Sequence, residues 1–289
     1  MQCNLCPRQC NALRTSDKNF GGVCKIPLNT VVARAALHFG EEPSISGTKG
    51  SGTVFFSGCS LHCVFCQNSD ISAKNVGKAI TPQNLAMIFK NLESEGAHNI
   101  NLVTPTHYTE ALLPLLENVP VPVVWNSSGY DSVQTLQKLA GKVDIYLPDL
   151  KFADGALAAT VSRAPDYPQT ARAAILEMVR QTGPYQMENG LLKKGVLIRH
   201  LVLPGQVDNS LAVIDWVADT FERGQVLFSL MSQYTPYRPL GGDWDRRLDK
   251  REWIKVRNYM KKRGITDGYV QDLSSAKAEY TPAFDFTGL

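Results

Sequence analysis

Short apolar runs alternate with longer segments of helical period along most of the chain. The first pair is an apolar run at residues 53–58 followed by a segment at residues 81–96. In the second segment the apolar residues fall on one helical face, Thr81 is the expected N-cap and Pro82 occupies the first helical position. This pattern predicts a strand followed by a helix.

The same alternation recurs five more times. The further strand–helix pairs are predicted at residues 99–105 and 109–119, 121–128 and 131–141, 143–151 and 167–183, 195–205 and 209–224, and 226–234 and 249–264. The strand runs are apolar enough to be covered on both faces, which is typical of parallel sheets. We therefore expect an α/β fold, a partial (β/α)6 barrel with right-handed crossovers, and a further short strand at residues 268–273.

Polar residues stand where each predicted strand ends. In parallel α/β folds the functional groups gather at the carboxyl ends of the strands. The candidates, in chain order, are Cys59; Thr104, Thr106 and His107; Asn126 and Ser127; Asp149 and Lys151; Arg199; and Gln233. The pattern predicts one functional rim built from six separate pieces of chain.

Composition excludes several classes of function. Of the 289 residues, 44% are hydrophobic and 20% are charged, and the net charge of +3 is too weak to indicate a nucleic-acid or membrane partner. No apolar run approaches the roughly 20 residues that span a bilayer, and the first ten residues lack the apolar core of a signal peptide. We expect a cytoplasmic protein.

The cysteines form two groups near the N-terminus. An odd count of seven, confined to a quarter of the chain and set among Gly, Pro, Asn and Ser, favours metal ligation over disulfides. The two groups are Cys3, Cys6, Cys10 and Cys24, and Cys59, Cys63 and Cys66.

The first group defines a predicted domain. Residues 1–46 do not fit the strand–helix repeat, so we expect a cysteine-rich metal-binding segment there and the barrel domain at residues 47–289. Four thiolates complete a closed site, either for zinc or for a second iron–sulfur cluster that relays electrons, and the sequence leaves both open. Glu41 and Glu42 are interpreted most simply as solvated charges, with a wall of the active-site mouth as the alternative.

The second group leaves a ligand position open. Three thiolates can hold three irons of a [4Fe–4S] cluster and leave the fourth iron to a non-protein ligand. Zinc with three protein ligands and water is the competing chemistry. The C-x3-C-x2-C spacing, with Phe65 before the third cysteine and no regularly spaced histidine or carboxylate, favours the cluster.

The loop "CSLHCVFC", residues 59–66, resembles the cluster loop of radical S-adenosylmethionine enzymes. "CQN", "YLPDLK" and "LIRHLVLPG" resemble, in order, motifs of the pyruvate formate-lyase activating enzyme. The resemblance covers about residues 47–275. It is strongest to the activase-like subgroup that carries an N-terminal "CNLCPRQC" segment.

The resemblance implies a function. A [4Fe–4S] cluster on Cys59, Cys63 and Cys66 would bind and reductively cleave S-adenosylmethionine, and the resulting 5′-deoxyadenosyl radical would abstract hydrogen from a substrate. The enzyme would activate a glycyl-radical enzyme or, alternatively, modify a peptide or small molecule. Flavodoxin or ferredoxin is the expected electron donor. A non-catalytic iron–sulfur or zinc protein is the alternative from another class.

The resemblance also assigns roles to residues. Phe65 would pack against adenine, with a core aromatic as the alternative, and Asn68 would contact adenosine or the loop backbone. Asp149 and Lys151 would lie at the methionine end, unless they form a structural salt bridge. Arg199 stands in an otherwise apolar strand, so it needs a bound carboxylate or a neighbouring Asp as acceptor.

Departures from the family pattern lie after the second strand. There the family's Gly-Gly-Glu is replaced by "TPTHY" at residues 104–108. Thr104, Thr106 or His107 would then supply the missing acceptor for the methionine amino group, and His107 could instead touch substrate.

Two further departures follow later strands. Asn126 and Ser127 offer neutral contacts where the activase has an acidic run, and Gln233 takes the place of a ribose-contacting histidine. These changes weaken an assignment of pyruvate formate-lyase as the substrate.

Overall fold

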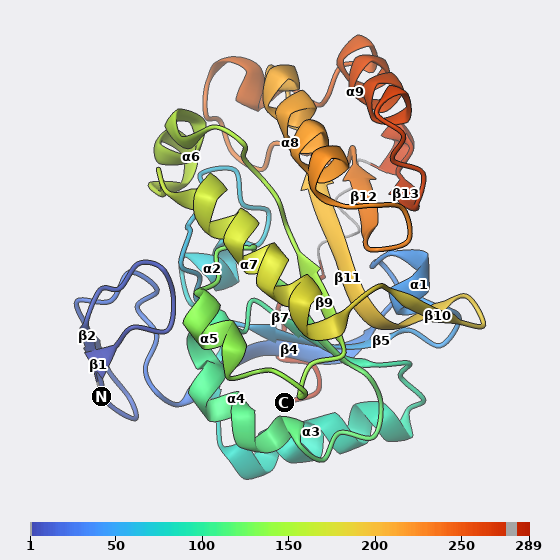
Figure 1. The fold of residues 1–289 in the computed structure, drawn as a ribbon. Coiled ribbons are helices and arrows are strands. Elements are labelled where there is room, and N and C mark those ends of the chain that lie inside the picture. The colour runs from blue at the N-terminus through green and yellow to red at the C-terminus, as the bar shows by residue number, and fades with distance from the viewer. Residues whose placement is uncertain (1, 276–281) are drawn as a thin grey trace.

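A large curved sheet organises the chain in this computed structural model, which describes residues 2–275 and 282–289 (Figure 1). Its spatial strand order is β13-β12-β11-β9-β8-β7-β5-β4-β6. Seven strands run parallel: β5 (Ser51–Phe56), β7 (Ile100–Val103), β8 (Val123–Ser127), β9 (Ile145–Pro148), β11 (Leu191–Leu201), β12 (Leu227–Met231) and β13 (Gly268–Val270). The predicted parallel sheet is confirmed, including the short last strand.

Helices follow each parallel strand up to β12 and cover the outside of the sheet (Figure 1). They are α3 (Pro82–Ser94), α4 (Thr109–Leu116), α5 (Val133–Gln137), α6 (Gly155–Ser162) with α7 (Tyr167–Thr182), α8 (Val207–Thr220) and α9 (Lys250–Lys262). The start of α3 is the predicted one, because the Thr81 side chain accepts a hydrogen bond from the Asn84 amide and Pro82 opens the helix. The six strand–helix units thus lie where the hydrophobic pattern predicts them.

Two antiparallel strands extend one edge of the sheet. β4 (Thr30–His38) pairs with β5, from Val32 opposite Phe56 to His38 opposite Ser51, and β6 (Lys78–Ile80) pairs with β4. β4 belongs to the stretch that the sequence assigned to the N-terminal segment, so the large sheet crosses the predicted boundary at residue 46. A short β10 (Gln186–Glu188) pairs with β11 as a hairpin.

The remaining N-terminal residues form a small lobe. Its antiparallel sheet consists of β1 (Gln2–Cys3), β2 (Ala12–Arg14) and β3 (Asn19–Phe20). Arg8 fixes the lobe to the barrel, because its guanidinium donates to the carbonyl oxygens of Ser60 at 2.8 Å and Ser162 at 2.7 Å. The lobe therefore lies directly on the loop that carries Cys59, Cys63 and Cys66.

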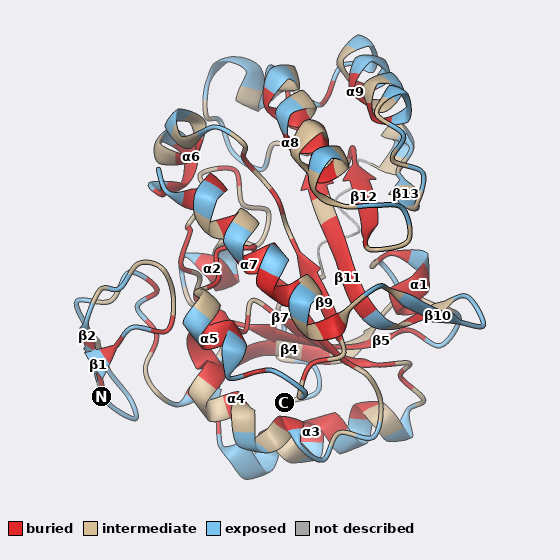
Figure 2. Cartoon of the chain, viewed as in Figure 1, coloured by how far each residue is buried: buried red, intermediate tan, exposed pale blue. Residues whose placement is uncertain are grey.

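The barrel interior is apolar at its amino-terminal end and polar toward the carboxyl ends of the strands. Helix α1 (Pro43–Ser46) closes the apolar end, because Ile45 is fully buried among Val124, Leu147, Leu197 and other strand residues. Figure 2 shows the central strands, such as β9, β11 and β12, as buried over most of their length. Because Ile45 is packed there, the preceding residues 40–43 are held against the barrel interior, on its open side.

Three short 3₁₀ helices and one small α-helix complete the described elements. They are η1 (Thr106–Tyr108), η2 (Gly242–Asp245), η3 (Leu273–Ser275) and α2 (Ser69–Ser72). The last residues run along β4, where the Phe286 amide donates to the Ala33 carbonyl oxygen and the Thr287 carbonyl oxygen accepts from the Ala35 amide. No helix in the described ranges is long and apolar enough to cross a membrane.

Candidate functional site

The cysteine loop begins directly after β5, as the sequence predicts. Gly58 makes this exit feasible: its φ is +88°, and a Cβ there would lie 2.2 Å from a side-chain carbon of Ile26. Cys59, Cys63 and Cys66 are free thiols. The Leu61 amide lies 3.4 Å from the Cys59 sulfur, as a hydrogen-bond donor to it.

The three thiols lie close enough to influence one another. Burial raises the pKa of Cys63 above that of an ordinary thiol, Cys59 and Cys66 raise it further, and the nearby Lys151 ammonium lowers it. Burial also raises the pKa of Cys66, while the Ser72 hydroxyl, 3.3 Å from its sulfur, lowers it. Buried thiolates need compensating positive charge, so this donor set fits a thiolate-ligated iron cluster.

The four N-terminal cysteines form a second group within the small lobe. Burial raises the pKa of Cys6 to about 12, and Cys24, Cys3 and Cys10 act in the same direction. The four thiols therefore lie near one another. No three His, Cys, Asp or Glu side chains in the described part of the chain are arranged to hold a single metal ion. Metal at either cysteine group is therefore a proposal.

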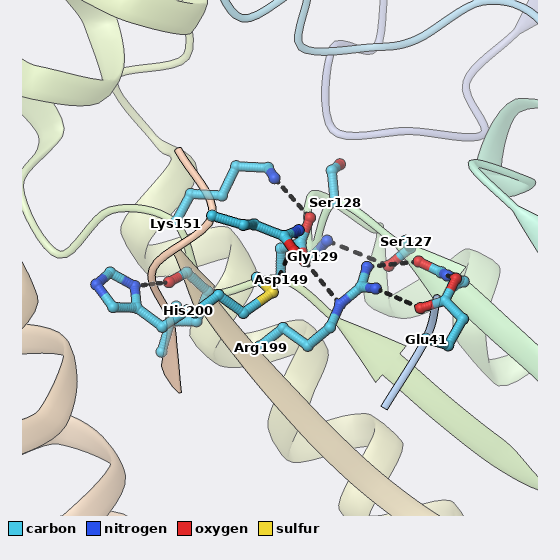
Figure 3. A network of polar contacts seen from close by, with 12 residues as sticks. Glu41, Ser127, Ser128, Gly129, Asp149, Lys151, Arg199 and His200 are labelled. Atoms are coloured by element: carbon cyan, nitrogen blue, oxygen red, sulfur yellow. Dashed lines mark hydrogen bonds and ion pairs between the residues drawn. The ribbon is translucent and has the colours of Figure 1, made fainter. Parts of the chain in front are cut away.

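A chain of alternating charges crosses the carboxyl end of the barrel (Figure 3). The Arg199 guanidinium donates from Nε to Asp149 Oδ1 at 3.0 Å, from Nη1 to Glu41 Oε2 at 3.0 Å and from Nη2 to Asn126 Oδ1 at 2.6 Å. Lys151 Nζ donates to the other oxygen of Asp149 at 2.5 Å. The order Lys151, Asp149, Arg199, Glu41 therefore alternates in sign.

The charges hold one another ionised despite their burial. Burial opposes ionisation of Asp149, but Arg199 and Lys151 outweigh it and keep the Asp149 pKa below its usual value. Burial likewise opposes the charge on Lys151, and Asp149 together with Cys63 raises the Lys151 pKa above its usual value. The network thus presents both fixed cations and fixed anions in a partly buried site.

This network lines a cavity of about 200 Å³. Six of the residues predicted from the sequence lie together there: Asn68, Asn126, Asp149, Lys151, Arg199 and Gln233. They come from four strand ends and from the segment after the cysteine loop, so these parts of the predicted rim lie together. The loop and the cavity adjoin, because Gln67 and Asn68 directly follow Cys66.

Glu41 was not among the candidate site residues, although the sequence analysis held a wall of the active-site mouth as its alternative role. The interpretation of Glu41 as a solvated charge is wrong, since its side chain is only 10% exposed and is paired with Arg199. Its other carboxylate oxygen accepts from Asn126 Nδ2 at 3.1 Å and from Asn101 Nδ2 at 3.2 Å. A signal was present, because a buried guanidinium needs more acceptors than one Asp provides.

Glu42 is also buried, which corrects its interpretation as a solvated charge. It is 8% exposed, and burial raises its pKa.

Four other candidate residues do not line this cavity. Thr106 and Ser127 donate hydrogen bonds to the two oxygens of Asp131, at 2.6 and 2.5 Å. The His107 ring contacts the Ser57 carbonyl oxygen at 2.8 Å, and burial lowers its pKa to about 4. Thr104 has a φ of +60° and its amide donates to the Asn126 carbonyl oxygen. "TPTHY" therefore places no side chain in this cavity, and its role as the acceptor stays a prediction.

Phe65 packs in an aromatic cluster. Its ring is parallel to that of Trp244 at 5.7 Å and meets Phe152 edge to face at 6.3 Å, and Phe65 is 7% exposed. The lining of this cavity does not include Phe65, and its contact with adenine stays a prediction.

Comparisons with known proteins agree with this picture. Residues 45–159, which contain the cysteine loop, match the family model of a 4Fe-4S single cluster domain. An uncharacterized protein of Methanocaldococcus jannaschii, MJ0674, is 31% identical over 248 residues, which is 81% of this chain. The chain spans 66% of the length of that relative.

Two solved structures share the fold. Streptococcus suis SuiB bound to S-adenosylmethionine matches 77% of this chain and 50% of its own with a TM-score of 0.53 at 15% identity. SuiB bound to the precursor peptide SuiA matches 77% and 49% with a TM-score of 0.52 at 16% identity. Together with the sheet order, they show that the chain has the predicted α/β fold with a curved parallel sheet and shares it with SuiB.

Proposed function

We propose that this chain is a radical S-adenosylmethionine enzyme. The observation that carries the proposal is the position of the Cys59–Cys63–Cys66 loop beside a cavity lined by Lys151, Asp149, Arg199 and Glu41. The match to a 4Fe-4S single cluster domain and the fold shared with SuiB support it. A cluster on the three cysteines would supply the electron that cleaves S-adenosylmethionine to methionine and a 5′-deoxyadenosyl radical.

The chain's own residues suit the amino-acid end of that cofactor. A carboxylate finds donors in Lys151 and Arg199, and an ammonium group finds acceptors in Glu41 and Asp149. Because these four charges already neutralise one another, a zwitterion can exchange with parts of the network without leaving an unpaired charge. We assign to Glu41 the acceptor role, because "TPTHY" places no side chain in this cavity.

Further residues would position the nucleoside. The amides of Asn68 and Gln233 line the same cavity and can hydrogen-bond ribose or adenine. Asn126 is held by Arg199 and Glu41, so its role is to fix those two side chains.

The substrate is a macromolecule segment or a small molecule that enters through the side of the barrel. A glycyl-radical enzyme remains one candidate, and a peptide or small molecule is the other. Among the described strands, β13 and β6 are the two ends of the sheet order, so the barrel is open between them. This opening supports access by either class, and the reductant is proposed to be a cytoplasmic flavodoxin or ferredoxin.

A second metal centre is proposed at Cys3, Cys6, Cys10 and Cys24. Arg8, which lies between Cys6 and Cys10, donates to the carbonyl oxygen of Ser60 in the catalytic loop. This direct contact supports an iron–sulfur centre that relays electrons, with structural zinc as the alternative.

The test is anaerobic reconstitution with iron and sulfide, reduction, and quantification of 5′-deoxyadenosine from S-adenosylmethionine. We expect product from the wild type and from Ser60→Ala, a change in the same loop that removes no thiol. Cys59→Ala should form none. Equal product from Cys59→Ala, or none from cluster-loaded wild type, would contradict the proposed function.

A further inference from the structure

A second cavity lies on the other side of Glu41 and Arg199. It measures about 310 Å³, within the range of small-molecule pockets, and lies between the segment after β4 and the end of β13. It shares Gly40, Glu41, Arg199, Met231 and Gln233 with the cavity assigned to the cofactor. A ligand here would therefore adjoin the cofactor.

Two buried polar atoms in its wall lack partners. Glu42 is 8% exposed and Ser229 is 1% exposed, and both line this cavity. Within the described residues, neither Glu42 Oε2 nor Ser229 Oγ has a hydrogen-bond partner of good geometry, although the Ser229 hydroxyl is near enough to the Glu42 carboxylate to lower its pKa. Buried polar groups in folded proteins are nearly always satisfied. Even with Ser229 beside it, the Glu42 carboxylate has no cationic hydrogen-bond donor among the described residues, so the pair indicates a ligand that the chain itself does not provide.

The charges of the wall select the kind of ligand. Glu41 and Glu42 contribute two carboxylates, and of the described lining residues only Arg199 is cationic. The Arg199 donors are already bound to Asp149, Glu41 and Asn126. An anion would face two carboxylates, whereas a cationic donor would satisfy both the charge and the free oxygen of Glu42.

The rest of the wall is apolar or aromatic. Phe39, Met231 and Tyr269 line the cavity and can cover a hydrocarbon stem, and the aromatic rings tolerate a nearby cation. Burial raises the pKa of Glu42 and the neighbouring Glu41 charge acts in the same direction, while the Arg199 charge and the Ser229 hydroxyl oppose them only in part. A bound cation would relieve both costs.

We infer that this cavity is the substrate subsite of the enzyme and that it takes a primary ammonium group on an apolar stem, with Glu42 as its ion-pair partner and Ser229 as a second polar contact. This inference rests on the proposed function for its biological meaning. The binding event itself can be tested without turnover.

The test is a ligand-observed NMR titration of the cluster-loaded protein with n-butylammonium, 1-butanol and butyrate as probes. We expect n-butylammonium to bind most tightly and Glu42→Gln to weaken it by at least about tenfold. Binding of 1-butanol should change by less than about twofold in that variant. Glu188→Gln, which alters an exposed carboxylate in β10, should leave all three probes unchanged.

The affinity for S-adenosylmethionine is measured in parallel, because it separates the two cavities. An unchanged cofactor affinity in Glu42→Gln, with weakened n-butylammonium binding, supports the subsite. A loss of cofactor affinity instead would assign Glu42 to the cofactor cavity and overturn the inference. Equal binding of the three probes would also overturn it, since water alone would then satisfy Glu42 and Ser229.

Ser229→Ala provides the second variant. It removes a hydroxyl group without adding charge. It therefore keeps the test decisive if thermal melting shows that Glu42→Gln does not fold. We expect weaker n-butylammonium binding with 1-butanol unchanged, and no change for the ammonium probe would contradict the inference. Failure of 5′-deoxyadenosine formation in the wild type would remove the proposed function but leave these binding results standing.

Discussion

Asn126 and Ser127 are neighbours in the chain, yet they belong to two different polar environments. Asn126 faces the cavity and bonds Arg199 and Glu41, whereas Ser127 faces outward and bonds the buried Asp131. The same division separates Arg199 from His200, whose ring contacts the Leu150 carbonyl oxygen and the Ser210 hydroxyl (Figure 3). Alternation along a strand therefore divides one polar rim into a cavity-facing group and a packing group.

The two groups differ in what their loss should change. The cavity-facing group carries compensated charges in a partly open site, so its variants should affect both binding and stability. The packing group consists mainly of buried side chains hydrogen-bonded to other parts of the protein, so its variants should affect stability alone.

The largest effect is expected from Arg199→Met. It leaves the buried carboxylates of Glu41 and Asp149 without their main partner, so the free energy of unfolding should fall by about 3–5 kcal/mol. Urea unfolding measures this change. Adding Glu41→Gln to Arg199→Met should restore part of the loss, and a double variant no more stable than the single one would show that the charges are not coupled.

Asp131→Asn tests the packing group. Its carboxylate accepts from both Thr106 and Ser127, and an amide cannot accept both bonds in the same way. We expect a loss of about 1–3 kcal/mol in the free energy of unfolding, with little change in S-adenosylmethionine affinity. A cofactor affinity that falls as far as it does in a cavity-facing variant would remove the distinction between the groups.

His200 gives the packing group a signature in pH. Burial lowers its pKa to about 4, so the folded protein binds fewer protons than the unfolded chain between that value and the ordinary histidine value. The contribution of His200 to the free energy of unfolding is fully present above the histidine pKa of the unfolded chain. It decreases as the pH is lowered, by about 2 kcal/mol between pH 7 and pH 5. Urea unfolding at both pH values should show a shallower dependence in His200→Gln, and an identical dependence would contradict the assignment.

An exposed ion pair sets the lower limit of these effects. Lys138 Nζ lies 2.5 Å from Glu110 Oε1, with both side chains substantially exposed. Lys138→Met should change the free energy of unfolding by less than about 1 kcal/mol and leave cofactor affinity unaltered. A larger loss in urea unfolding would contradict the expectation that exposed ion pairs stabilise the fold much less than the buried charged network does.

Much of the fold could be predicted because the chain repeats one unit. Thr81 and Pro82 mark a helix start through local chemistry, and the apolar runs mark the parallel strands without further information. β4 could not be predicted in this way, because it precedes the first strand–helix unit and pairs antiparallel with β5, outside the repeated pattern. The rim was predictable for the same reason as the strands, since parallel strands end at one edge.

Two features of the site were not predictable: the directions of individual side chains, and the charged residue that a distant segment contributes. "TPTHY" turns through a 3₁₀ segment, so Thr106 and His107 face the packing side rather than the cavity. Glu41 lines the cavity from the segment between β4 and the buried Ile45, a placement that no local pattern reveals. Arg199 alone pointed to a missing carboxylate.

The most direct test of the central claim is the S-adenosylmethionine affinity of cluster-loaded Asp149→Asn and Ser127→Ala, measured by anaerobic equilibrium dialysis beside the wild type. Asp149 lies in the charged network of the cavity, and Ser127 stands on the neighbouring strand with its side chain directed away. We predict an affinity at least about tenfold weaker in Asp149→Asn and within about twofold of the wild type in Ser127→Ala. Equal losses in both variants, or none in Asp149→Asn, would contradict the assignment of this cavity to the cofactor.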